Sequence, residues 1–75
     1  MTPENLSRRI VRDVYALTAG KPMLWVPVET ITCRLALGDE DMVSQAIELV
    51  RRKCWLDFAG GHSICLTNEG RRMAR

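Results

Sequence analysis

The fold of this chain depends on the stretch Asp39 to Lys53, DEDMVSQAIELVRRK. At about 100° per residue in an α-helix, its apolar residues gather in one narrow stripe and its polar residues on the opposite side. The stripe consists of Val43, Ile47, Val50 and Cys54, with Ala46 at its edge. The opposite side carries Asp41, Ser44, Gln45, Glu48 and Arg52. This pattern predicts a helix over residues 40–53 that buries one face in a core and offers the other to DNA, to a protein partner or to water.

The whole chain has the size and composition of one small folded domain. Its 75 residues are near the lower limit at which a single core sustains itself. The net charge of +2 is only mildly basic, so charge alone does not establish DNA binding. The sequence has no signal peptide and no apolar run long enough to cross a bilayer. The chain has an odd number of cysteines, Cys33, Cys54 and Cys65. We therefore expect them to be reduced thiols in a cytoplasmic protein.

The residues before this stretch predict a helix, a short strand and a second helix. Thr2, Pro3 and Glu4 begin a helix expected over residues 3–19, because they supply a capping hydroxyl, a proline at the first position and an acid at the positive end of the dipole. The apolar run at 23–26 lies between two prolines and favours a strand that pairs with something distant. A helix over residues 28–37, ended by Gly38, would meet the 40–53 helix across a short turn, which is typical of a helix-turn-helix.

The apolar stripe of the helix at 3–19 is wider than one partner helix needs. It comprises Leu6, Ile10, Val14 and Leu17, widened by Val11, Tyr15 and Thr18. One interpretation is that the rest of a small domain wraps this helix. The other is a homodimer contact through the same helix, since two-fold pairing is common among small soluble modules.

Residues 55–67 predict a β-hairpin, because Gly60 and Gly61 stand between two apolar runs and both central positions of the favoured turn need positive φ. With these glycines at the turn, three cross-strand pairs are expected. They are Trp55 with Leu66, Leu56 with Cys65, and Asp57 with Ile64. Thr67 then caps a helical stub expected over residues 68–74.

This order of elements resembles the winged helix-turn-helix superfamily, as found in bacterial transcription regulators. The resemblance covers almost the whole chain and rests on VSQAIELVRRKC (43–54), WLDF (55–58), the glycine turn and LTNEG (66–70). Cys54 stands where the family usually has a glycine that ends the third helix. The resemblance implies an α+β, mainly α fold in a single domain over residues 1–75. In that fold a three-helix core carries a short strand and a C-terminal β-hairpin wing.

The resemblance also implies a small DNA-binding protein that regulates transcription. In such proteins the third helix enters the major groove and the wing contacts the minor groove or phosphates. Contacts to double-stranded DNA are expected from the third helix, through Asp41, Met42, Ser44, Gln45, Glu48, Arg51 and Arg52. Further contacts are expected from Gly60, Gly61 and His62 of the wing and from Arg34. Gln45 can make two hydrogen bonds to adenine, and Ser44 can contact a base or a phosphate.

The charges around the 40–53 helix leave a second function open. Asp39, Glu40, Asp41 and Glu48 repel phosphates, and only Arg51 and Arg52 oppose them, of which Glu48 can neutralise Arg52. The first three acids also have a purely structural explanation, since carboxylates stabilise a helix N-terminus. The wing tip has no Lys or Arg. The alternative function is a winged helix used as a protein-interaction or dimerisation module without DNA binding.

Neither a metal, a cofactor nor an enzymatic activity is expected. The candidate metal ligands are Cys33, Cys54, His62 and Cys65, and they include no C-x-x-C pair. His62 and Cys65 are three positions apart, so in a strand they would point to opposite faces. Buried structural cysteines are expected instead. His62 has no evident acid to orient it, and the chain contains no phosphate loop or nucleophile elbow.

Overall fold

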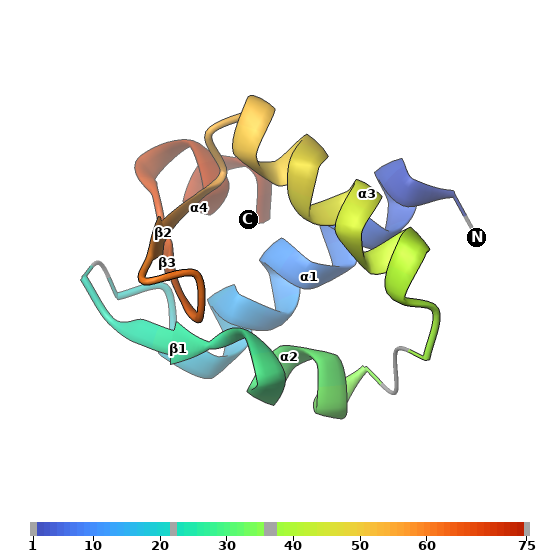
Figure 1. Cartoon of the computed structure of the whole chain (residues 1–75). Helices are drawn as coiled ribbons and strands as arrows, with labels where there is room; N and C mark the ends of the chain where they lie inside the picture. Colours follow the sequence, from blue (N-terminus) through green and yellow to red (C-terminus); the bar gives the residue numbers. More distant parts are fainter. Residues whose placement is uncertain (1, 22, 36–37, 75) are drawn as a thin grey trace.

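The computed structural model describes residues 2–21, 23–35 and 38–74. In chain order its elements are α1 (Pro3–Thr18), β1 (Trp25–Pro27), α2 (Val28–Arg34), α3 (Glu40–Arg52), β2 (Leu56–Ala59), β3 (Ser63–Leu66) and α4 (Asn68–Ala74). In Figure 1, α1 runs through the middle of the molecule, α3 lies along one side of it, and α2 and the sheet lie along the other sides. The chain is therefore mainly helical with a small antiparallel sheet, which confirms the α+β class expected from the sequence.

The ends of α1 are fixed by local hydrogen bonds. Thr2 accepts the N–H of Asn5 at 3.1 Å, and Pro3 follows at the first helical position, as predicted. At the other end the N–H of Gly20 reaches the carbonyl of Tyr15 at 3.0 Å. Gly20 has a positive φ of 73°, and Ala19 before it is also left-handed, with φ 54°. Because two residues leave the helix this way, α1 ends at residue 18.

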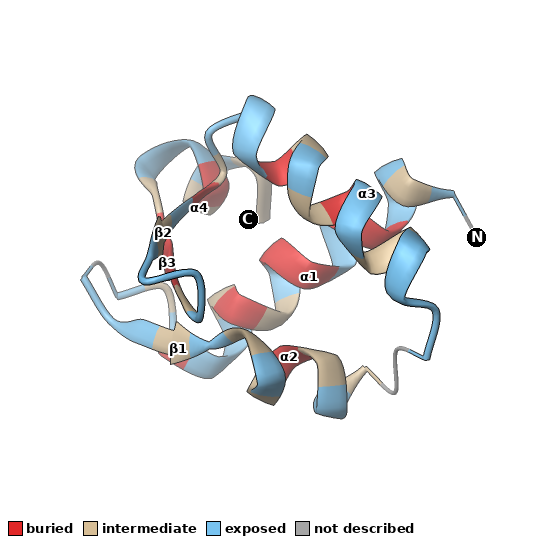
Figure 2. Ribbon diagram, in the orientation of Figure 1, coloured by how far each residue is buried: buried red, intermediate tan, exposed pale blue. Residues whose placement is uncertain are grey.

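The core forms around α1 (Figure 2). Its fully buried apolar residues are Leu6, Ile10, Val11, Val14, Ile31, Ala46, Val50, Leu56, Ile64 and Leu66. They come from three helices and two strands, so the wide stripe of α1 is wrapped by the rest of the chain. The α1 residues that suggested a dimer contact are buried, apart from Tyr15, which is partly buried against the core, and Leu17, which is 39% exposed.

The buried face of α3 is centred differently from the prediction. Ala46 and Val50 are fully buried, whereas Val43 and Ile47 are only partly buried. Ala46 was expected at the edge of the stripe but lies at its centre, where its small side chain lets α3 approach α1 closely. Cys54 was expected within the stripe and is exposed, because the chain leaves the helix before reaching it.

The end of α3 has the geometry that a glycine usually provides. The N–H of Cys54 bonds to the carbonyl of Arg51 and that of Trp55 to the carbonyl of Val50, both at 3.1 Å. These two bonds define a Schellman motif, in which the residue after the helix is left-handed. Cys54 takes that conformation, with φ 58°. The position therefore behaves as the glycine of the resembled family would, although its side chain is a thiol.

The helix α2 is shorter than predicted. It ends at Arg34, and Leu35 leaves it with φ −91° and ψ 1° while making a last helical bond to the carbonyl of Ile31. Leu35 packs on the core at this bend, which turns the chain toward α3. The predicted residues 36–37 lie outside the described residues.

The sheet has the strand order β1-β3-β2, with antiparallel pairs throughout. The distant partner expected for the first strand is therefore β3. The strand occupies residues 25–27 and not 23–26, because Met23 is left-handed, with φ 64°, and cannot belong to it. Pro27 is tolerated inside β1 because β1 is an edge strand, where a missing N–H leaves no bond unmade.

The hairpin turn was predicted correctly, but its register was not. Gly60 and Gly61 have φ of 60° and 71°, and the N–H of His62 closes the turn on the carbonyl of Ala59. His62 is then an extra residue, so that Ala59 faces Ser63. The expected pairs are each shifted by one: Leu56 faces Leu66, Asp57 faces Cys65 and Phe58 faces Ile64. The shift leaves the carbonyl of His62 free to accept the N–H of Val28 at 2.8 Å, which holds the turn against the start of α2.

Thr67 joins the end of α3 to the start of α4. Its hydroxyl accepts the N–H of Gly70 at 3.0 Å, which confirms the predicted cap, and donates to the carbonyl of Cys54 at 2.5 Å. The second bond links residues 13 positions apart and was not predicted. Gly70 is buried in α4 beneath this junction.

Candidate nucleic-acid interface

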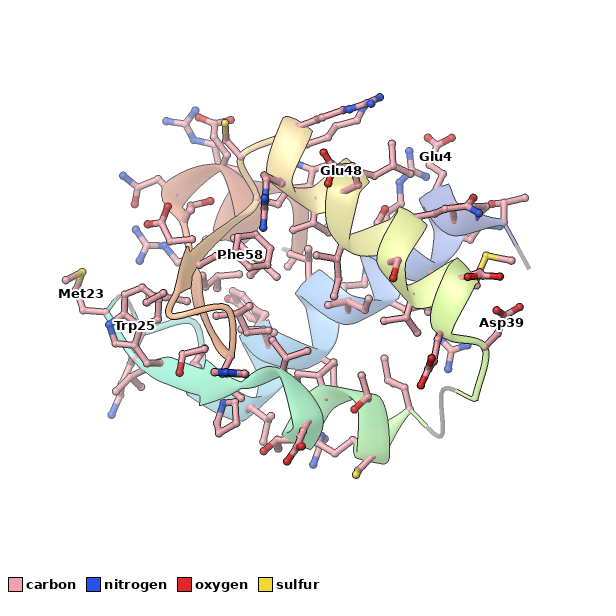
Figure 3. All side chains as sticks on the ribbon, viewed as in Figure 1. Glu4, Met23, Trp25, Asp39, Glu48 and Phe58 are labelled. Carbon is pink, nitrogen blue, oxygen red and sulfur yellow. The ribbon has the colours of Figure 1, made fainter. Side chains whose placement is uncertain are left out.

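The polar face of α3 is exposed to solvent along its whole length, as the sequence predicted. Its exposed members are Asp41, Ser44, Gln45, Glu48, Arg51 and Arg52, and Met42 beside them is half-buried. Residues three and four apart lie side by side on a helix, so these residues form one continuous row. In Figure 3, Glu48 stands on the outer side of α3 and Asp39 marks the start of that helix. The helix therefore brings all seven candidate residues of the 40–53 stretch onto or beside one surface.

This row is divided by charge. Its first turn is acidic, with Asp39, Glu40 and Asp41, and its last turn is basic, with Arg51 and Arg52. The arrangement stabilises the helix, because carboxylates favour the N-terminal end of the dipole and cations the C-terminal end. Asp39 also accepts the N–H of Met42 at 3.1 Å as the N-terminal cap. For a DNA ligand, the consequence is repulsion at the start of α3 and attraction at its end.

The cations at the end of α3 contact aromatic rings. The guanidinium carbon of Arg51 lies 4.9 Å from the centroid of the Phe58 ring, and Lys53 Nζ lies 5.7 Å from that of Trp55. Both distances are within the range of a cation–π interaction. Phe58 and Lys53 were not among the site residues expected from the sequence. The contacts of Arg51 with Phe58 and of Lys53 with Trp55 depend on the left-handed turn at Cys54, which brings β2 alongside the end of α3. A cysteine does not predict such a turn.

No ion pair joins the expected partners Glu48 and Arg52, and among the described residues no carboxylate lies within ion-pair distance of Arg51, Arg52 or Lys53. The predicted neutralisation of Arg52 is therefore wrong. Because both side chains are exposed, this pair would have contributed little to the stability of α3.

Arg34 lies on α2 and binds a carboxylate of α1. Its Nε donates to Asp13 Oδ2 at 2.9 Å and its terminal nitrogen to Oδ1 at 3.1 Å. These hydrogen bonds, and the negative charge of Asp13, raise the pKa of Arg34 above its ordinary value. The two-point contact ties α2 to α1. A phosphate would have to share this guanidinium with Asp13, and the expected DNA contact of Arg34 stays a prediction.

The hairpin tip exposes backbone groups and contains no Lys or Arg. Gly60, Gly61 and His62 are all exposed. The carbonyl of His62 accepts the N–H of Val28, and this bond connects the turn to the start of α2. Gly61 and His62 line a hollow between the turn and the start of α2, together with Pro27, Val28 and Glu29. The turn residues of the hairpin therefore neighbour α2, whereas Phe58 and Trp55 connect the hairpin to the end of α3.

An apolar cavity of about 10 Å³ lies between α2, α3 and the sheet, lined by residues that include Ile31, Val43 and Phe58. Ligand sites are typically of several hundred Å³, and this cavity is at most the size of one water.

Two of the three cysteines are not buried as expected. Cys33 and Cys54 are exposed and Cys65 is buried, all three as free thiols. Cys54 is exposed because α3 ends before it, and Cys33 because it lies on the outer side of α2. Within the described ranges no three His, Cys, Asp or Glu side chains are grouped to hold a metal ion.

The chain matches no protein-family model, and no curated protein or solved structure is significantly similar to it. In the part of the chain that the structure describes, no helix has both the length and the apolar character needed to span a membrane.

Proposed function

We propose that this protein is a small winged-helix transcription regulator that binds double-stranded DNA through α3, with the β2–β3 hairpin as its wing. The observation that carries the proposal is the exposed polar row of α3, which follows a short helix and a turn and lies beside a glycine-tipped hairpin. A helix of this kind fits the major groove, whose width admits one α-helix.

Within the row, Ser44 and Gln45 are the candidates for reading bases. They are exposed, uncharged and half-way along α3, between its acidic and basic ends. The amide of Gln45 can donate to and accept from the edge of an adenine, and Ser44 can contact a base or a phosphate. Arg52, which is exposed at the basic end, is suited to phosphate, which carries no sequence information.

The proposal is tested by titrating the protein with a mixed-sequence duplex at 50 mM and 200 mM salt. Binding in the micromolar range that weakens steeply with salt is expected, because phosphate contacts release condensed counterions. No binding at the lower salt would refute DNA binding.

Two variants test the roles of individual residues. Gln45→Ala is expected to relax sequence preference, whereas Arg52→Ala is expected to weaken binding to all sequences alike. Equal losses on every sequence for both variants would remove Gln45 from base reading.

A second candidate function, association with a protein or a second copy of this chain, is supported by a different surface. Among the residues that the structure describes, four large apolar ones are exposed: Leu17 at 39%, Met23 at 75%, Leu24 at 44% and Trp25 at 46%. Met23 and Trp25 lie close together on one side of the molecule in Figure 3. Exposed apolar clusters favour protein contacts over DNA contacts. Sedimentation equilibrium separates the two cases: a dimer that Leu24→Lys dissociates supports association, and a monomer at all concentrations counts against self-association.

A further inference from the structure

The three consecutive cations at the end of α3 differ from the arginines that form ion pairs in this structure. Arg8, Arg34 and Arg72 each bind a carboxylate, at 3.1, 2.9 and 3.3 Å respectively. By contrast, Arg51, Arg52 and Lys53 are exposed and have no carboxylate within ion-pair distance among the described residues. Their positive charge is therefore available to an anionic ligand.

Arg51 is also held in place. Its guanidinium lies 4.9 Å from the centroid of the Phe58 ring, and Phe58 is anchored in β2, opposite Ile64, with its side chain packed against the core. Figure 3 shows Phe58 between the hairpin and α3. A guanidinium that lies over a ring keeps N–H groups available to a ligand and loses less conformational freedom on binding than an unsupported side chain.

We propose that the DNA backbone meets this protein at the C-terminal end of α3, where Arg51 contacts a phosphate and Phe58 is its positioning residue. The inference rests on the DNA binding proposed above and specifies where the phosphate lies. It also accounts for the acidic first turn of α3, since a backbone that crosses the basic end stays farther from Asp39, Glu40 and Asp41. The wing then acts through the ring of Phe58, with no cation needed at its tip.

The first experiment measures binding of a fluorescent 30-base-pair duplex of mixed sequence at 50, 100 and 200 mM salt. For Arg51→Ala we expect about tenfold weaker binding to every sequence, with a salt slope smaller by about 1, as for loss of one phosphate contact. Arg12→Ala removes an exposed cation from α1 as the matched control, and it is expected to stay within about twofold of the parent. Equal effects of the two variants would overturn the inference.

The second experiment tests the positioning role of Phe58. Phe58→Leu keeps an apolar side chain but removes the ring, so binding is expected to weaken about threefold without a change in salt slope. Phe58→Tyr keeps the ring and is expected to restore parental affinity. In an Arg51→Ala background, Phe58→Leu should have no further effect, because the cation that the ring orients is gone. An undiminished effect in that background would show a role independent of Arg51.

The two proposals fail in different ways. If the parent protein binds no duplex at 50 mM salt, DNA binding itself fails and the inference falls with it. If the parent binds and Gln45→Ala changes its sequence preference, while Arg51→Ala behaves as Arg12→Ala does, DNA binding stands and only the placement of the phosphate is wrong. Far-UV circular dichroism and urea unfolding of each variant ensure that folded protein is compared.

Discussion

Cys54 occupies a backbone position that favours glycine. Its φ of 58° is left-handed, a conformation that costs a residue with a Cβ about 1–2 kcal/mol. Glycine avoids this cost but adds freedom to the unfolded chain, so Cys54→Gly is expected to raise the free energy of unfolding by about 1 kcal/mol. Cys33 is a matched control, since it is also an exposed cysteine but lies within α2. Urea unfolding should show Cys33→Gly destabilised by about 0.5–1 kcal/mol; losses of similar size at both positions would contradict the strain at Cys54.

Gly70 is required for a different reason, which is space. A Cβ at this position would lie 2.1 Å from the carbonyl oxygen of Trp55 and 3.0 Å from Leu66 Cδ1. Because the first neighbour is backbone, α4 has to shift away from the hairpin, and Gly70→Ala is expected to destabilise the fold by about 2–3 kcal/mol. Gly38 has nothing within 4 Å of the same added atom. Thermal unfolding of Gly38→Ala should therefore show little change, and a parental melting temperature for Gly70→Ala would mean that the close approach is relieved at no cost.

At the scale of the elements, one hydroxyl connects three of them. Thr67 lies between β3 and α4, caps α4 through the N–H of Gly70, and donates to the carbonyl of Cys54 after α3. Thr67→Ala removes both bonds and is expected to cost about 1–2 kcal/mol of unfolding free energy. Thr67→Ser keeps the hydroxyl and should cost less than half as much. If urea unfolding gives equal losses for alanine and serine, the methyl group and not the hydroxyl stabilises this junction.

The sequence predicts those elements whose causes are local. The cap at Thr2, the glycine turn at 60–61 and the cap at Thr67 depend on residues within three or four positions, and each is present. The features that it missed depend on partners far along the chain. The Arg34–Asp13 pair spans 21 residues, and the extra residue at His62 is held by α2. For the site, the exposed row of α3 follows from helical period alone, whereas the Arg51–Phe58 contact required the turn at Cys54.

At the scale of the whole molecule, the exposed apolar residues and the charges are both unevenly distributed over the surface. The core buries most of the apolar stripe of α1. Among the described residues, the large apolar side chains that stay exposed are therefore Leu17 and those of residues 23–25. The charges of α3 run from acidic at its start to basic at its end. These two asymmetries place the surface suited to a protein partner near β1 and the surface suited to an anionic ligand at the end of α3. Either surface can be altered without touching the core, which makes the two candidate functions separable by mutation.

The charge asymmetry gives the last prediction. The double variant Glu40→Gln and Asp41→Asn removes two exposed carboxylates from the start of α3 while keeping the cap at Asp39. If DNA lies along α3, all duplexes should bind roughly threefold more tightly at 50 mM salt, and less so at 200 mM, where charges are screened over a shorter distance. Glu4→Gln is a stringent control, because it removes a carboxylate from the first turn of α1 and also releases Arg8 from its ion pair. Fluorescence anisotropy of the three proteins decides the matter: a gain for the double variant no larger than that for Glu4→Gln would place the start of α3 away from the DNA.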